Sequence, residues 1–378
     1  MISKLLNSNF NMRIIKKSNP KNVPMTSKLI LVLVLLISSA SYSQTSFAGI
    51  KTSPTDSADF FLQKGLLEKN NGRKMEALKN LEKAAKYDAE NKAVITELSA
   101  VYLDLRKYHN AREMFKKLVS LGDESAANYK QLLQLSFQLK QNDDVLLYAG
   151  KLKTAAPEEK VNFYIGKVQY DMENYGEAIK TLGRAANEDT ANAEIPYMIA
   201  HSYADMLNYK MAVPYFQRAI QLAPTQNYWI YELSMIYYAM NDDRNALKYM
   251  LEAGEKGYRR DNDYLENLGI AYLNVGELDK GVEILSEILK RKPSDMNILN
   301  MLAEAFYYKK KYDEAIAYWD KILEYDKTSA SSLYMIGMAY QKKGGKENTN
   351  KGITLCDKAI EMDPALASLK QKKMTMGL

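Results

Sequence analysis

The stretch MLNYKMAVPYFQRAIQLAP, residues 206–224, decides the fold because the chain repeats its pattern. Residues 173–186, ENYGEAIKTLGRAA, and residues 309–326, KKKYDEAIAYWDKILEYD, keep the same order. A tyrosine is followed three residues later by an alanine, and four positions further on by a bulky apolar residue. Intervals of three and four residues are typical of one face of an α-helix. Each copy therefore predicts a helix that packs through the same face.

The recurrence extends along most of the chain at a fixed period. Pairs of small residues twelve positions apart mark it at Gly65 and Ala77, Ser99 and Ala111, Gly166 and Ala178, Ala200 and Ala212, Ser234 and Ala246, Gly269 and Gly281, and Ala303 and Ala315. Gly337 and Gly352 form a further pair with three extra residues between them, and Leu133 with Val145 is a weaker match. Units then begin near residues 58, 92, 126, 159, 193, 227, 262, 296 and 330. Such a period indicates a repeat architecture.

Each unit predicts two packed helices. Small residues at the crossing points let the helices approach, where a larger side chain would overpack by about 1–3 kcal/mol. A bulky residue at the position of Phe216 is expected to fill the seam to the next unit. The equivalent residues are Leu81, Phe115, Leu182, Met250, Leu285 and Trp319. Proline cannot continue a helix, so second helices should end just before Pro157, Pro224, Pro293 and Pro364.

The unit at 193–226 resembles a tetratricopeptide repeat. The residues that carry the resemblance are Ala200, Tyr203, Tyr209, Ala212, Phe216, Ala219 and Pro224. The resemblance covers residues 58–366 and implies an all-α, right-handed superhelical solenoid of about nine helix-turn-helix units, because one helical hairpin cannot bury its apolar face alone. Around this array we expect a polar linker at 44–57 and a capping helix at 367–378.

Residues 1–43 are predicted to be a secretory signal peptide, with translation starting at Met1, Met12 or Met25. Lys28 precedes the apolar run 29–37, and Ser41 and Ser43 suit cleavage before Gln44. Ser46 and Ala48 offer a second cleavage option, before Gly49. The run is too short to span a bilayer, which takes about 20 residues. We therefore expect an exported, soluble protein of a bacterial periplasm; an uncleaved leader that leaves the protein membrane-associated is the alternative.

The basic charge of the chain belongs to this leader. Residues 1–43 hold six Lys or Arg and no acid, and the remainder holds 46 basic and 46 acidic residues. A nucleic-acid partner needs a basic surface, so we expect none. Cys356 is the only cysteine, which excludes an intramolecular disulfide and fits the periplasm better than a disulfide-rich secreted class.

The titratable residues do not form the pattern of an active site, and we predict a non-enzymatic protein without cofactor or metal. His109 is expected in an inter-helix turn, and His201 on the inner face of a first helix. Cys356 occupies the core position equivalent to Phe216, which predicts a buried thiol. The acidic stretches 141–144 and 241–244 are interpreted as helix caps, and 343–348 as a lengthened turn of the ninth unit.

In this family the first helices line a concave groove that commonly holds a partner peptide. The resemblance places aromatic residues, methionine and one histidine there: Phe163, Tyr164, Tyr170, Tyr197, Met198, His201, Tyr228, Tyr231, Met235 and Tyr238, with Tyr307, Tyr308, Tyr334, Met335 and Met338 further on. Such side chains suit a recognition surface; packing between helices is the alternative reading. We expect the rings of Tyr197, Tyr231 and Tyr238 to face solvent as a strip.

These observations favour a non-catalytic interaction scaffold of the cell envelope that binds a protein or peptide partner in its groove. Two alternatives stay open. One is an accessory subunit tethered to a membrane complex, and the other is a glycan-binding protein that uses the tyrosine-rich groove.

Overall fold

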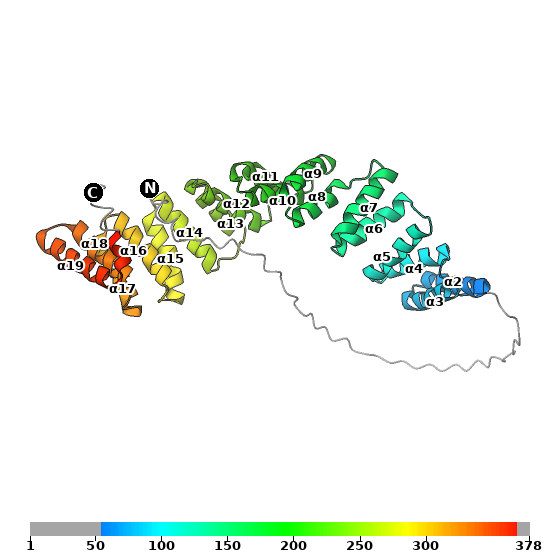
Figure 1. Cartoon of the computed structure of the whole chain (residues 1–378), viewed down its shortest axis with the longest axis horizontal. Helices are drawn as coiled ribbons and strands as arrows, with labels where there is room; N and C mark the ends of the chain where they lie inside the picture. Colours follow the sequence, from blue (N-terminus) through cyan, green and yellow to red (C-terminus); the bar gives the residue numbers. More distant parts are fainter. Residues whose placement is uncertain (1–53, 369–378) are drawn as a thin grey trace, which may run out of the picture. The chain divides into compact units, whose positions relative to one another are not determined.

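The computed structural model describes residues 54–368, and these form helices without a strand (Figure 1). The helices are α2 (Pro54–Asn70), α3 (Lys74–Tyr87), α4 (Lys92–Asp104), α5 (Tyr108–Ser120), α6 (Ala126–Gln138), α7 (Asn142–Ala155), α8 (Asn162–Asp171), α9 (Tyr175–Glu188), α10 (Glu194–Asp205), α11 (Tyr209–Leu222), α12 (Asn227–Ala239), α13 (Asp243–Glu255), α14 (Asn262–Val275), α15 (Leu278–Arg291), α16 (Met296–Tyr308), α17 (Tyr312–Tyr325), α18 (Ala330–Lys343) and α19 (Lys346–Met362), followed by the 3-10 turn η1 (Pro364–Leu366). The predicted all-α repeat fold is confirmed.

The predicted signal peptide, its cleavage site and most of the linker and of the capping helix lie outside the described residues, so they stay predictions. No helix within residues 54–368 has both the length and the apolar character needed to cross a membrane.

The described helices divide into two compact units. One runs to Met172 and contains α2 to α8, and the other begins at Glu173 and contains α9 to α19. The division falls in the turn that was expected inside the fourth repeat. Within each unit every helix packs on the next one along the chain. The even-numbered helices are the first helices of the repeats, and the odd-numbered helices from α3 on are the second.

Where the two helices of a repeat cross, the space between them admits only small residues. A Cβ atom added to Gly269 would lie 2.5 Å from the side chain of Leu285, and one on Gly281 would lie 2.5 Å from Leu273. In the last repeat, a Cβ on Gly337 would lie 2.7 Å from the carbonyl oxygen of Gly352. Helix contacts this close accept no larger residue without movement of the backbone or of a buried side chain.

The bulky seam residues lie in the core as expected. Leu81, Phe115, Leu182, Phe216, Met250, Leu285, Trp319 and Cys356 are all buried. The four prolines also follow second helices: α7, α11, α15 and α19 each end two residues before one of them. Seam packing and helix ends therefore recur with the repeat.

The turn inside each repeat uses a backbone feature that the sequence pattern did not indicate. After α10, Leu207 adopts a left-handed conformation with φ 59°. The amide of Asn208 then donates to the carbonyl of Tyr203 at 2.8 Å, which is the bond of a Schellman motif. The other first helices before α18 are also followed by a residue in the left-handed conformation. Two of these residues, Gly72 and Gly276, are glycine. The rest are Arg106, Lys140, Glu173, Asn241 and Lys310.

The ninth repeat differs from the expectation of a lengthened turn. Only Gly344 and Gly345, both with positive φ, separate α18 from α19. The three extra residues instead lengthen the second helix, because α19 has 17 residues where α17 has 14. The predicted long turn at 343–348 is therefore wrong.

Candidate functional site

The first helices of the second unit share a row of side chains outside the core. The row follows from intervals of three and four residues, which place side chains on one face of a helix. We call it the first-helix stripe: Glu194, Tyr197 and His201 in α10, Tyr228, Tyr231, Met235 and Tyr238 in α12, Asp263, Glu266, Ile270 and Asn274 in α14, and Asn297, Asn300, Glu304 and Tyr308 in α16. All of these except Tyr231 are exposed or partly buried. The stripe is the candidate site.

Glu232 is the centre of a polar cluster that joins α10 to α12. The hydroxyl of Tyr197 donates to Oε2 of Glu232 at 2.8 Å, and Nε2 of His201 lies 2.9 Å from Oε1. Burial raises the pKa of Tyr228 above the usual range of a tyrosine, and the charge of Glu232 raises it further. The ring of Tyr197 stacks on Trp229 with centroids 4.4 Å apart. These contacts fix the rings in place before any partner arrives, so binding would cost little side-chain entropy.

A second aromatic group lies where α12 meets the segment before α14. The ring of Tyr231 stacks on Tyr258 at 4.3 Å, and Tyr228 stacks on the same ring at 6.3 Å. The amide of Asn267 donates to the Tyr231 hydroxyl at 2.7 Å. Burial raises the pKa of Tyr231 to about 12, so the hydroxyl stays neutral at physiological pH. Tyr228 presents a ring that is 42% exposed on top of this stack.

Three of the predicted groove residues, Met198, Tyr231 and Tyr334, belong to the core. Met198 is 2% exposed and Tyr231 is 4% exposed, so the expectation that Tyr231 faces solvent is wrong. Tyr258 covers its ring from the segment between α13 and α14. Met235 and Tyr238 are partly buried and pack against the core from the stripe.

Phe163, Tyr164 and Tyr170 lie on α8, in the first compact unit. Phe163 and Tyr164 are partly buried around Phe137 of α6, with centroid distances of 6.1 and 5.0 Å. Lys167 lies over the ring of Tyr170 at 6.0 Å. These residues form an aromatic group of their own unit.

Several residues of the site were not singled out from the sequence. Glu266 and Glu304 belong to the stripe itself, and Trp229, Glu232, Tyr258 and Asn267 contact it or lie beside it. A signal for Glu232 exists, because it is the only charged residue of the otherwise apolar helix α12. Tyr258 gives none, since it lies in a segment between helices where periodicity carries no information.

The remaining titratable candidates show structural roles. His109 lies in the first turn of α5, not in the preceding turn, and is exposed. Cys356 is buried, and Gln341 donates an amide hydrogen bond to its sulfur at 3.3 Å. Asp242 caps α13 by accepting from the amide of Asn245. Within the described part of the chain, no cluster of three or more His, Cys, Asp or Glu side chains could hold a metal ion.

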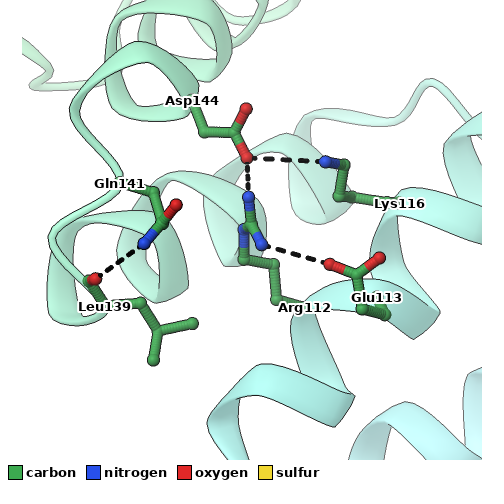
Figure 2. A network of polar contacts seen from close by, with 6 residues as sticks. All are labelled: Arg112, Glu113, Lys116, Leu139, Gln141 and Asp144. Carbon is green, nitrogen blue, oxygen red and sulfur yellow. Dashed lines mark hydrogen bonds and ion pairs between the residues drawn. The ribbon is translucent and has the colours of Figure 1, made fainter.

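The acidic stretch 141–144 is held by cations, as Figure 2 shows. The buried guanidinium of Arg112 in α5 donates to Asp144 in the first turn of α7, and also to Glu113 at 3.1 Å. The ammonium of Lys116 lies 3.6 Å from the same Asp144 carboxylate. This network couples second helices of adjacent repeats, and it leaves Asp144 engaged with protein cations.

Two family models match parts of the chain. The tetratricopeptide repeat model matches residues 266–332, and the model of the ChAPs, the Chs5p-Arf1p-binding proteins, matches residues 126–254. Repeated helical hairpins of the length and register seen throughout residues 54–368 agree with the first of these.

Two curated relatives are similar at low identity. The BBSome complex member BBS4 homolog of Drosophila melanogaster is 20% identical over 281 residues, which is 74% of this chain and 53% of that protein. The BBSome complex member BBS4 of Bos taurus is 27% identical over 238 residues, 61% of this chain and 43% of that protein. The chain thus spans about half the length of the curated relatives it matches.

Three solved structures with partial similarity are two TPR proteins and a pilus biogenesis factor. YrrB, described as a TPR protein with an unusual peptide-binding site, is 20% identical with a TM-score of 0.40, and the match covers 50% of this chain and 97% of YrrB. The C-terminal part of a TPR repeat-containing protein from Cytophaga hutchinsonii is 16% identical with a TM-score of 0.43, covering 72% and 98%. The type IV pilus biogenesis factor PilW is 17% identical with a TM-score of 0.38, covering 56% and 97%.

Proposed function

The chain is a tetratricopeptide-repeat protein, and we propose that it is a non-catalytic scaffold that binds a partner protein or peptide along the first-helix stripe. The observation that carries the proposal is the fixed aromatic surface of α10 and α12. Tyr228 offers an exposed ring stacked on Tyr258, and Glu232 orients Tyr197 and His201 beside it. Rigid, partly exposed aromatic side chains are typical of the residues that dominate binding energy.

The names of the similar proteins support an interaction role. The two curated relatives are members of a complex, the BBSome, and the ChAPs model is named for proteins that bind Chs5p and Arf1p. These names favour a general role as a subunit that binds other proteins.

The binding proposal is tested by removing exposed rings from the stripe. Tyr228→Ala and Tyr308→Ala act on rings that are 42% and 38% exposed, so the fold should survive. Each change should weaken partner binding by about 2 kcal/mol if the ring lies at the centre of the interface. Tyr325→Ala, at the end of second helix α17 and 50% exposed, is the matched control.

The measurement is quantitative capture of partners from extracts of the source cells by each immobilised full-chain variant, with circular dichroism to verify folding. Partners lost with the two stripe variants and retained with Tyr325→Ala support the proposal. Equal capture by all three variants would contradict the proposal, and the second helices would then be the next candidate for the binding surface.

We further propose that the protein is exported and works in the cell envelope. The support is Lys28, the apolar run 29–37 and the small residues Ser41 and Ser43. Intact-mass spectrometry of the native protein should give an N-terminus near Gln44 in the periplasmic fraction. A protein that retains residues 29–37 in the membrane fraction would favour the tethered subunit instead.

A further inference from the structure

Four of the five first helices of the second unit have a one-sided charge, and the fifth, α18, carries Lys342 and Lys343. Helices α10, α12, α14 and α16 contain no Lys or Arg, and their acidic residues are Glu194, Asp205, Glu232, Asp263, Glu266 and Glu304. Each of these four helices is followed by a second helix, α11, α13, α15 or α17, that carries at least one Lys or Arg. The first helices of the other unit, α2, α4, α6 and α8, each carry a lysine. The acidic row is therefore a property of these four helices.

Glu266 in α14 is a partly buried carboxylate without a cation. No Lys or Arg among the described residues forms an ion pair with it, and the two arginines that precede α14 in the sequence pair with other carboxylates. Arg259 pairs with Asp261, and Arg260 pairs with Glu287. Burial raises the pKa of Glu266, and the charges of Asp295 and Asp263 raise it further. The fold therefore keeps the Glu266 carboxylate at a position where burial and neighbouring negative charges both disfavour its charged form.

Glu304 in α16 repeats this situation one helix further on. Its carboxylate is partly buried, and it accepts a hydrogen bond from the Asn300 amide at 2.8 Å. Asn300 is itself fixed, because its oxygen accepts from the indole of the buried Trp319 at 2.9 Å. Burial raises the pKa of Glu304, partly offset by the Asn300 bond. No Lys or Arg within residues 54–368 forms an ion pair with the carboxylate, which the Asn300 hydrogen bond nevertheless holds in position.

Aromatic rings stand beside the second carboxylate. Tyr308 follows Glu304 by one helical turn and is 38% exposed, and its pKa is raised by burial and by the charge of Glu304. Tyr307, partly buried, contacts Tyr308 edge to face at 5.8 Å. A carboxylate next to tyrosine rings can hold a cation through both charge and the ring face.

We propose that the stripe of α14 and α16 binds a lysine- or arginine-bearing segment of a partner protein, with Glu266 and Glu304 as the carboxylates that accept its cations and Tyr308 as the ring beside them. The inference rests on the proposed function and names the chemistry of the partner. Charge complementarity carries it: the two positioned carboxylates form no ion pair with a Lys or Arg of the described chain, and helices α10, α12, α14 and α16 contain neither residue type.

The test uses the full chain and two synthetic probes. One is a fluorescein-labelled peptide of about twelve residues that alternates arginine with alanine, and the other has citrulline in place of arginine, which keeps the shape and removes the charge. Binding is measured by fluorescence anisotropy at about 0.15 M salt, where contacts between distant exposed charges are screened. The arginine peptide should bind at least about tenfold more tightly than the citrulline peptide.

The variants locate the site. Glu266→Gln with Glu304→Gln should weaken binding of the arginine peptide by about tenfold or more. Glu283→Gln with Glu314→Gln removes the same charge from exposed positions of second helices α15 and α17, and should change the affinity by less than about twofold. Circular dichroism verifies that both double variants fold.

The outcomes separately test the assignment of Glu266 and Glu304, the cationic class of the ligand and its origin in a partner protein. Equal effects of the two double variants would overturn the assignment of Glu266 and Glu304. Equal binding of both probes would overturn the cationic class, while peptide binding along the stripe, and so the proposed function, would stand. A synthetic peptide of residues 1–28 of this chain, which hold six Lys or Arg and no acid, is tested as a competitor of the labelled arginine peptide. If it competes more strongly than unlabelled arginine peptide does, the ligand of the stripe is the chain's own basic segment, and the proposal of a separate partner protein is wrong.

Discussion

At the scale of single residues, Leu207 holds a backbone conformation that its side chain disfavours. Its φ is 59° and its side chain is 70% exposed. Crowding of the Cβ atom in this region costs about 1–2 kcal/mol, and a glycine loses about 0.5–1 kcal/mol more on folding. Leu207→Gly should therefore stabilise the protein by up to about 1 kcal/mol, measured as a higher midpoint in thermal unfolding.

The neighbouring Met206 provides the control. It is 53% exposed and has φ −80°, which any residue adopts. Met206→Gly gains nothing in the fold and should destabilise by about 0.5–1 kcal/mol. Shifts of the same sign in both variants would show that the left-handed turn is not the source of the effect.

Glu304 should destabilise the fold at neutral pH. Burial raises its pKa in the folded protein, so the folded state binds its proton more tightly than the unfolded state does. Stability then falls as pH rises from the unfolded pKa through the raised folded pKa. We expect Glu304→Gln to unfold at a higher temperature than the wild type at pH 7, and the difference to vanish below about pH 4, where the carboxyl is protonated in both states.

Glu283→Gln is the comparison, because Glu283 is exposed. Its effect on the unfolding temperature should be small at every pH. A stabilisation by Glu304→Gln that persists at low pH would indicate that the amide gains a new contact, not that the charge was unfavourable. A residue that stabilises when neutralised is typical of a functional site.

Space at the helix crossings could be predicted from the sequence, whereas the exposure of Tyr231 could not. Gly269 and Gly281 were placed correctly because helix pairs repeat and only small residues fit there. Tyr197 and Tyr231 have equivalent positions in their repeats, yet Tyr231 is buried because Tyr258 folds over it from a segment between helices. Helical periodicity describes a residue within its helix and says nothing of such a cover.

At the scale of helices, the repeat period predicted the pairs, but the turns inside them follow from backbone chemistry. Six of the eight turns that precede α18 use a left-handed residue other than glycine, as Leu207 and Asn241 illustrate. Ends of second helices are easier to predict. A proline follows some of them, and elsewhere an aspartate such as Asp88 or Asp326 accepts from the amide two residues on.

The crossing of α10 and α11 should fail if Ala212 is enlarged. Ala212 is fully buried in a cluster with Ala200 and Phe216. Ala212→Arg both overpacks this contact and buries an unpaired charge, which should cost about 3 kcal/mol or more. Hydrogen exchange should show faster exchange in α10 to α12.

Met211→Arg introduces the same side chain one residue earlier, where Met211 is 44% exposed. It should leave exchange in these helices close to that of the wild type. Similar protection in both variants would mean that Ala212 is not at a helix crossing and that the assigned register is wrong.

At the scale of the whole molecule, contacts within each compact unit run from each helix to its sequence neighbours. Stability is then approximately a sum of local terms, and a change in one repeat should be felt mainly in that repeat and the adjacent ones. The described chain is also divided at Met172 and Glu173, so the first repeats and the last repeats belong to different units.

This arrangement predicts how far the loss of one core residue spreads. Trp319 is fully buried between α16, α17 and α18, and its indole donates to Asn300. Trp319→Ala should cost about 3–5 kcal/mol locally and raise exchange rates in α16 to α18. Exchange in α2 to α5 should stay unchanged, because those helices belong to the other compact unit. Tyr325→Ala, on the same helix but half exposed, should change neither region. A uniform loss of protection from α2 to α19 after Trp319→Ala would show that the chain unfolds as one cooperative body, against the nearest-neighbour description.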